Sequence, residues 1–188
     1  MTARIEPLLT IADWDAIPYD EWHRYEIIEG ELFVSCSPGL THQTVATNLT
    51  VLIGIFLATN PIGTVVATPG LILSKFSGVI PDIVVFLNEQ RETIVSNDRL
   101  TGPPALVVEI LSPGSANTRR DRVVKLNLYA KHGVPEYWIV DPKNRSLERY
   151  VLQESSLELL EILTTEDYLT INALPGFSCP MSRVFNPI

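Results

Sequence analysis

The sequence predicts an α/β fold, and two kinds of pattern indicate it. Short apolar runs bounded by Gly, Pro or Ser and rich in β-branched residues are typical of buried strands, and they read TVVATPGLILS, VIPDIVVFL, ALVVEILS and EYWIV. Two amphipathic segments, one opening near Thr41 and one over about 118–132, have helical spacing. The 188 residues suffice for one core and are short for two, so a single domain over 1–188 is expected.

The first third of the chain predicts an entry segment, a hairpin and a helix. Residues 1–24 show no sustained period, and we expect them to lean on the body of the protein. The run YEIIEGELFVS predicts two strands about Glu29-Gly30, because glycine accepts the positive φ of a tight turn. Thr41 is the expected N-cap of a helix whose apolar residues recur over 45–57, and Asn60-Pro61 ends it.

The remaining elements follow in the order strand, strand, strand, helix, strand. The second helix is expected to end at Gly133, a residue type common just past helix C-termini, and EYWIV then forms a strand closed by Asp141-Pro142. SLERYVL and LELLEIL predict a further hairpin around 154–156, and the tail after Leu174 is expected to be irregular.

Composition excludes several classes of protein. The chain is 46% hydrophobic and carries 22 acidic against 14 basic residues, a net charge of −8, which argues against disorder and against a basic nucleic-acid coat. The longest apolar run, VLIGIFLA, is far shorter than the roughly 20 residues that span a bilayer, so no membrane is expected. Two lone cysteines and a start without signal-peptide layout predict a cytoplasmic protein.

Two acidic residues interrupt otherwise apolar strands. Asp82 lies within VIPDIVVF and Glu109 within ALVVEILS, where a buried carboxylate without a partner costs several kcal/mol. If the strands are neighbours, two carboxylates at roughly 4 Å repel by about 4 kcal/mol at an effective dielectric near 20. A divalent cation removes that penalty, and oxygen ligands suit Mg²⁺, with Mn²⁺ as a substitute. The alternative is a buried structural network with backbone or arginine donors.

Lys125 is the candidate third member of this site. It lies on the helix after the Glu109 strand, where an ammonium group steadies charge on phosphorus or positions the attacking water. The alternative is an exposed helix pair with Asp121 at i−4, worth a few tenths of a kcal/mol.

The same helix concentrates positive charge. Residues 117–133 carry a net charge of +4 within a chain of −8, from Arg119, Arg120, Arg122, Lys125 and Lys131 against Asp121. Arg119, Arg120 and Arg122 are therefore candidate phosphate-binding residues. The alternative is a solvated helix face whose arginines pair with nearby acids.

Over residues 25–150 the sequence resembles the Uma-type putative restriction endonuclease family of the PD-(D/E)XK nuclease superfamily. The resemblance rests on YEIIEGEL, PDIVVF, VVEILSPGS and RRDRVVKLNLYAKHGVPEYWIVDP. It implies a restriction-endonuclease-like core of a mixed four-stranded sheet flanked by helices in the order α-β-β-β-α-β. Pro81-Asp82 matches the PD pair and Glu109 the acid of the E-x-K element. Leu111 stands where that lysine is usual, and the resemblance implies that Lys125 substitutes for it.

The resemblance also suggests His42 and Glu29 as accessory residues. His42 falls on the Val45 side of its helix and should point inward, where a neutral imidazole bonded to the backbone is an equal alternative. Glu29 has the alternative of a plain turn residue.

Three functional hypotheses follow. The first is a Mg²⁺-dependent endonuclease that hydrolyses DNA, with Asp82 and Glu109 on the metal and Lys125 assisting water. The second is a catalytically inactive protein of the same fold that binds nucleic acid or protein, favoured by Leu111 and the acidic balance. The third is a homo-oligomeric module, a homodimer in its simplest form, that pairs through the apolar edge of the C-terminal hairpin.

Overall fold

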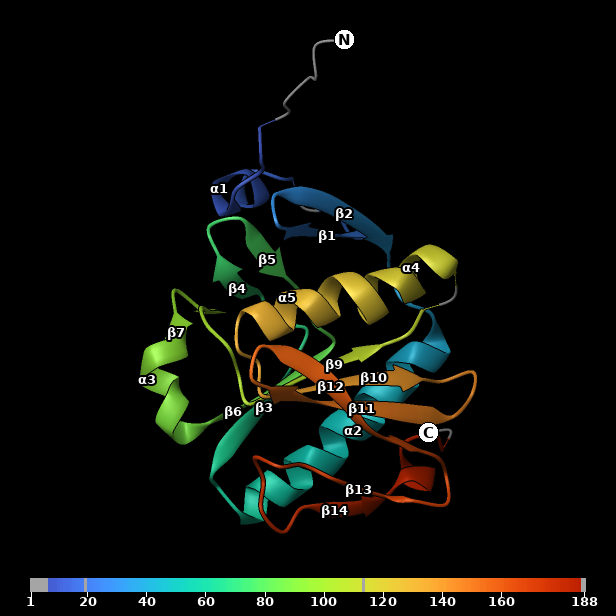
Figure 1. Ribbon diagram of the computed structural model, residues 1–188. Coiled ribbons are helices and arrows are strands. Elements are labelled where there is room, and N and C mark those ends of the chain that lie inside the picture. The colour runs from blue at the N-terminus through green and yellow to red at the C-terminus, as the bar shows by residue number, and fades with distance from the viewer. Residues whose placement is uncertain (1–6, 19, 113, 187–188) are drawn as a thin grey trace.

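The computed structural model describes residues 7–18, 20–112 and 114–186, and a mixed six-stranded sheet lies at its centre (Figure 1). The strand order is β12-β11-β10-β9-β6-β3. These strands are β3 (Gly63–Ala67), β6 (Ile83–Leu87), β9 (Leu106–Ile110), β10 (Glu136–Asp141), β11 (Ser146–Gln153) and β12 (Ser156–Leu163). Only β9 and β10 are parallel among these neighbours, and they need the helical crossover that parallel strands require. The predicted mixed α/β fold is confirmed.

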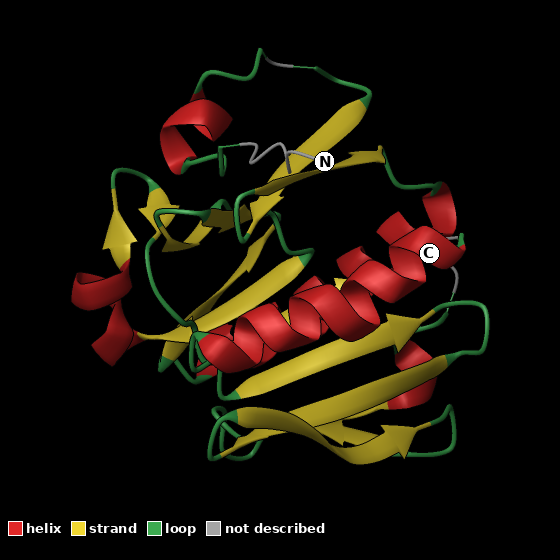
Figure 2. Cartoon of the chain, turned by 45° about the horizontal axis from the view of Figure 1, so that its top comes forward, coloured by secondary structure: helices red, strands yellow, loops and turns green. Residues whose placement is uncertain are grey.

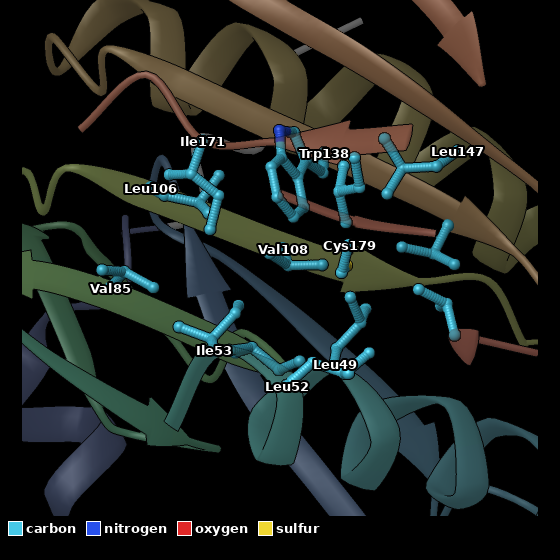
Figure 3. Packing of buried hydrophobic residues seen from close by; sticks show 14 of the residues in the cluster. Leu49, Leu52, Ile53, Val85, Leu106, Val108, Trp138, Leu147, Ile171 and Cys179 are labelled. Carbon is cyan, nitrogen blue, oxygen red and sulfur yellow. The ribbon is translucent and has the colours of Figure 1, made fainter. Parts of the chain in front are cut away.

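One face of this sheet packs against α2 (Leu40–Thr59). Figure 3 shows Leu49, Leu52 and Ile53 of α2 facing Val85, Val108 and Trp138 of the sheet. By length and composition alone α2 could also cross a membrane, with a mean hydropathy of 1.3 over its most apolar stretch. In the fold it serves as a core helix, since its apolar side chains pack on the sheet.

The C-terminal segment completes the same core. It contains the two-stranded sheet of β13 (Tyr168–Thr170) and β14 (Ser178–Pro180), followed by the 3₁₀ turn η3 (Met181–Arg183). Leu169, Leu174, Phe177 and Met181 are buried among the core side chains. The expectation of an irregular tail after Leu174 is therefore wrong in part, since β14 and η3 lie in it. The apolar side chains of this tail pack in the core, which holds its backbone in regular structure.

The opposite face packs against one continuous helical segment (Figure 2). It consists of α4 (Ser115–Arg119), the π-helical stretch η2 (Arg120–Lys125) and α5 (Leu126–Lys131). Leu128 and Tyr129 pack there against Val107, Tyr137 and Ile139. A π-helical turn inside a helix is rare and frequently marks a functional site.

A second six-stranded sheet, in the order β2-β1-β5-β4-β8-β7, lies against the first. It comprises β1 (His23–Ile28), β2 (Glu31–Cys36), β4 (Leu71–Ser74), β5 (Ser77–Val79), β7 (Val95–Ser96) and β8 (Arg99–Leu100), with α1 (Ile11–Asp15), η1 (Asn88–Gln90) and α3 (Arg91–Ile94) beside it. The hairpin turn has the predicted form, with φ of 52° at Glu29 and 83° at Gly30. The α1 helix packs so closely that a Cβ on Gly78 would lie 2.5 Å from the Trp14 ring.

Several element boundaries differ from the predictions. The run TVVATPGLILS is two strands, β3 and β4, which belong to different sheets. Asp82 directly precedes β6 and does not lie inside a strand. The predicted helix near Thr41 is α2, which begins at Leu40 and has Gly39 as its N-cap in place of Thr41.

The C-terminal hairpin forms as predicted. Strand β12 is an edge strand that exposes Leu159, Leu160 and Ile162. The apolar edge expected for self-pairing is therefore present, and the homodimer itself stays a prediction.

Candidate active site

Asp82 and Glu109 lie side by side at the end of two paired strands. β6 and β9 are antiparallel with Ile83 opposite Val108, and Asp82 and Glu109 are the residues that follow this last pair on either side. Directly opposed residues point to the same face of a sheet. Both residues are buried, and Asp82 Oδ2 accepts a hydrogen bond of 2.8 Å from the backbone N–H of Ile110. The structure thus brings together the two acids that the sequence singled out.

Asp82 is held as a carboxylate by cationic and polar donors. Arg24 Nη1 donates to Oδ1 at 3.0 Å, and His42 Nε2 donates to Oδ2 at 3.1 Å. Burial alone would raise the pKa of Asp82, but His42, Arg24 and the Ile110 N–H outweigh it and lower the pKa to about 2. Asp82 is therefore charged at neutral pH, and His42 faces the site as its helical position predicted.

Glu109 shares one oxygen between two buried donors. Lys125 Nζ donates to Oε1 at 2.9 Å and the Tyr129 hydroxyl donates to the same atom at 2.7 Å. Burial raises the pKa of Glu109 to about 8, and the charges of Asp82, Asp121 and Glu26 add to this rise against the opposing effect of Lys125. A proton on the other carboxyl oxygen leaves Oε1 free to accept both bonds.

Lys125 is fully enclosed by these acids. Its side chain is only 1% exposed, and its ammonium group also donates to Glu26 Oε1 at 2.9 Å. Burial by itself would lower the pKa of Lys125, but Glu109, Glu26 and Asp121 outweigh it and raise the pKa. The exposed helix pair with Asp121 considered from the sequence is therefore not the arrangement found. Leu111 occupies the position where the E-x-K element usually has its lysine, and it packs on the sheet face that η2 covers. Lys125 lies in η2 and places its amino group beside Glu109 from the helix instead of from the strand.

Glu26 is a member of the cluster that sequence reasoning missed. It lies on β1 of the second sheet, and its Oε1 accepts hydrogen bonds from Lys125 and from the backbone N–H of Ile80 at 2.8 Å. The available signal was the same as for Asp82, since Glu26 is a single acid among the apolar residues of YEII. Arg24, two residues earlier on the same face of β1, was missed as well.

Glu29 does not join this cluster. It occupies the β1–β2 turn, half exposed, and pairs with Lys131 at 2.6 Å. The hairpin directs Glu26, three residues earlier, toward the site, while the turn carries Glu29 out to the end of α5. The plain turn residue weighed from the sequence is the arrangement found.

Two of the three arginines expected to hold phosphates are paired with acids of the protein, and the role of Arg119 stays a prediction. Arg120 bends inward and bonds Asp121 at 3.1 Å, with Glu26 Oε2 at 4.0 Å. Arg122 forms an ion pair with Glu148. Arg119 is exposed. Arg120 and Arg122 thus follow the alternative of arginines paired with nearby acids, which neutralises much of the helix charge.

The donors at this site match the chemistry of a hard divalent cation. Within the described part of the chain, no group of three or more His, Cys, Asp or Glu side chains is arranged to hold a metal ion. Mg²⁺, however, takes one or two protein carboxylates and completes its shell with water and substrate phosphate. Asp82 and Glu109 supply such a pair. Burial is the main cause of the raised pKa of Glu109 and neighbouring carboxylates add to it, and a bound cation would offset both effects.

The fold and this cluster of two acids and a lysine define a nuclease-like α/β protein. The chain belongs to the Uma2 family, described as putative restriction endonuclease, whose family model matches residues 11–182. It is similar in fold to a crystal structure described as a putative nuclease belonging to DUF820 from Anabaena variabilis ATCC 29413, with a TM-score of 0.75 and 18% identity over 94% of this chain and 97% of that chain. No curated protein matches the sequence.

Proposed function

We propose that this protein is a Mg²⁺-dependent endonuclease that hydrolyses DNA phosphodiester bonds, with Mn²⁺ as a substitute. The observation that carries the proposal is the contact between Lys125 Nζ and Glu109 Oε1 at 2.9 Å, next to Asp82, which directly precedes the neighbouring strand β6. Two carboxyl groups and one ammonium group thus meet in one buried cluster, from the residue before β6, from β9 and from η2. Membership of the Uma2 family supports a nuclease.

Each residue has a role that follows from its contacts. Asp82 and Glu109 would hold the metal ion, which when bound polarises the phosphate and its attacking water. Lys125 places a positive charge beside Glu109, where charge develops on the phosphate. Tyr129 and Glu26 are positioning residues, because each fixes Glu109 or Lys125 through one hydrogen bond. The hydrolysis is direct, with water as the nucleophile and no covalent intermediate.

A second candidate function is a DNA- or protein-binding module of the same fold that does not cleave. It is favoured by one specific observation: both oxygens of Asp82 already have partners, Arg24 on Oδ1 and His42 with the Ile110 N–H on Oδ2. If this arrangement persists in the presence of Mg²⁺, Asp82 is a structural acid and the site is inactive.

Cleavage of supercoiled plasmid in Mg²⁺ or Mn²⁺ distinguishes the two. We expect Asp82→Asn and Lys125→Met to reduce the cleavage rate at least about 100-fold, the usual effect of removing one electrostatic contributor. Lys75→Met, an exposed lysine in the β4–β5 turn, is the matched control and should cleave at the wild-type rate. Melting temperatures identify variants that fail to fold. Equal nicking by folded Asp82→Asn and wild type would attribute the cleavage to a contaminant and discard the proposal.

A further inference from the structure

A groove opens beside the candidate active site. It has a volume of about 720 Å³ and is lined by the first turn of α2, by Leu111, Ser112 and Gly114 after β9, by the helix that follows, and by the β10–β11 turn at 141–144. We call it the α2 groove. These elements lie on the same side of the molecule in Figures 1 and 2. His42 forms part of its wall and also donates to Asp82, so one side chain separates the groove from the candidate metal ligand.

The first turn of α2 offers backbone donors to this groove. The N-cap is Gly39, which has no side chain to satisfy the first turn. The N–H groups of Leu40, Thr41 and His42 have no intrahelical acceptor, and no other described residue accepts from them. α2 is 20 residues long, so its N-terminus carries the full partial positive charge of a helix dipole. Such an end favours phosphate groups.

Two side chains of the groove point independently to a ligand there, His42 through an unpartnered nitrogen and Lys143 through its charge. The His42 side chain is 8% exposed, and its Nδ1 is buried without a hydrogen-bond partner among the described residues. An unmet buried polar atom is unfavourable. Because Nε2 donates to Asp82, Nδ1 is an acceptor, and a water molecule that bridges it to a bound phosphate would satisfy it. On the opposite wall Lys143 is exposed and has no ion pair within the described part of the chain.

The other charged groups of the groove are already engaged. The Asp141 carboxylate accepts hydrogen bonds from the backbone N–H groups of Lys143 and Asn144 and from the Asn144 side chain, so its oxygens face the turn. Arg122 is paired with Glu148. The available charge is therefore positive, from Lys143 and the α2 N-terminus, in a chain whose net charge is −8.

From this juxtaposition we infer that the α2 groove binds the sugar-phosphate backbone of one DNA strand beside the cleavage site. One phosphate lies on the N–H groups of the first turn of α2, a second lies against Lys143, and the strand continues past His42 to Asp82 and Glu109. The inference rests on the proposed function for its substrate class. Arg120 and Arg122 pair with acids of the protein and do not contact phosphates in this way. In the inferred complex the first turn of α2 and Lys143 make the phosphate contacts instead.

The test measures DNA binding in EDTA, where cleavage does not interfere. Fluorescence anisotropy of a labelled 20-base-pair duplex is recorded at several salt concentrations for wild type, Lys143→Ala and the matched control Lys75→Ala, an exposed lysine of the β4–β5 turn. We expect Lys143→Ala to bind several-fold more weakly and to reduce the slope of log K against log salt by about 1, the value for one lost phosphate contact. Lys75→Ala should retain the wild-type slope.

A second pair of variants tests the backbone donors without removing a charge. Leu40 is the first residue of α2 and is 84% exposed, so proline there preserves the helix and deletes one N–H group. Leu40→Pro is compared with Leu40→Ala, which loses the same side chain but retains the N–H. We expect the proline variant to bind DNA several-fold more weakly than the alanine variant at equal helicity by circular dichroism.

The outcomes separate the groove from the proposed function. The inference is overturned if Lys143→Ala binds DNA as Lys75→Ala does and Leu40→Pro binds it as Leu40→Ala does. It is also overturned if the wild-type protein does not bind the duplex at low salt, whether or not plasmid is cleaved. Weakened binding by Lys143→Ala and Leu40→Pro supports the groove even if the wild-type protein proves unable to cleave. Tight binding of free inorganic phosphate without any binding of the duplex would assign the groove to a small anion and contradict the inference.

Discussion

At the scale of single residues, the Arg24 guanidinium group and a divalent metal ion would compete for the same oxygen of Asp82. Its Oδ1 accepts from Arg24 at 3.0 Å, and Arg24 belongs to β1 of the second sheet. A divalent ion that binds this oxygen must displace the guanidinium group. Arg24 thus compensates the charge of Asp82 when no metal is bound, and it opposes metal binding for the same reason.

Replacing Arg24 should therefore tighten metal binding. A hydrogen bond to a charged group is worth about 1.5–3 kcal/mol, so we expect Arg24→Met to lower the Kd for Mn²⁺ by about tenfold or more in calorimetry. Arg91→Met, an exposed arginine on α3, is the control and should bind Mn²⁺ as the wild type does. Weaker or unchanged binding by folded Arg24→Met would show that the guanidinium does not compete with the ion.

The raised pKa of Glu109 makes a prediction for stability against pH. With a folded-state pKa of about 8 against an ordinary value of 4.5, the native state holds a proton on Glu109 that the unfolded chain releases. The free energy of unfolding should then fall as pH rises between about 4.5 and 8, by at most about 1.4 kcal/mol per pH unit from this group. The contribution of Asp82 to stability depends on pH with the opposite sign, because its pKa is lowered from 3.8 to about 2. This contribution is lost as pH falls from about 3.8 to about 2.

Urea unfolding of wild type and Glu109→Gln at pH 5 to 8 isolates this effect. We expect the stability of the Gln variant to depend less on pH over this window than that of the wild type. Parallel curves for the two proteins would mean that Glu109 is ionised throughout.

Sequence reasoning located the site residues that have a recognisable local sequence pattern. An acid inside an apolar run identified Asp82 and Glu109, and helical position placed His42 inward. Glu26 carried the same local signal and was overlooked, whereas Arg24 had none, because its partner Asp82 lies 58 residues further along the chain. Whether a buried acid meets a cation, a lysine or a backbone donor is decided by tertiary pairing.

At the scale of elements, the η2–α5 segment fixes the chemistry of β9. Lys125 ends η2 and Tyr129 follows one turn later in α5, and both donate to Glu109 Oε1. The Tyr137 hydroxyl of β10 donates to the backbone carbonyl of Asp121, which ties the π-helical stretch to the sheet. The helix and strand therefore hold the cluster from both sides.

Tyr129→Phe tests this connection between helix and strand. The variant leaves the ring in place and removes one buried donor to Glu109, so we expect the free energy of unfolding to fall by about 1–3 kcal/mol. Tyr150→Phe is the matched control, because its hydroxyl bonds Glu148 at a partly exposed site and should cost less. Equal losses from the two variants in denaturant titrations would contradict the structural role of Tyr129.

The order of elements was predictable from the sequence, but the membership of each sheet was not. The run TVVATPGLILS looks like one strand, since its apolar residues are nearly continuous. Thr68 has a positive φ of 50° within it, and the chain leaves the central sheet there to enter the second. The very short strands β7 and β8 have too few residues to show any period.

At the scale of the whole molecule, the C-terminal segment completes the core on the α2 face. It is also anchored by polar bonds: Arg149 Nη2 donates to Asn172 Oδ1, and the Asn172 backbone N–H donates to Glu136 Oε2. Residues 25–150, which the sequence suggested as the nuclease core, thus leave apolar side chains without the cover that the tail provides. The site is far from this segment in sequence but depends on the sheet that the segment stabilises.

The two cysteines report on this packing. Cys179 of β14 is buried, and burial raises the pKa of its thiol to about 11, whereas Cys36 of β2 is exposed. Because the thiolate is the reactive form, we expect one fast equivalent of Ellman's reagent in the native protein and a second only on unfolding. Cys36→Ala should abolish the fast phase and Cys179→Ala should preserve it. Two fast thiols in the wild type would show that the tail opens independently of the core.

The central claim is that Asp82 and Glu109 hold one divalent cation, and a crystal structure in Mn²⁺ tests it most directly. We expect one ion with side-chain oxygens of both residues about 2 to 2.5 Å away, and Arg24 released from Oδ1. An ion-free cluster at saturating Mn²⁺, with Arg24 and His42 still bonded to Asp82, would contradict the nuclease proposal and leave a binding protein of the same fold.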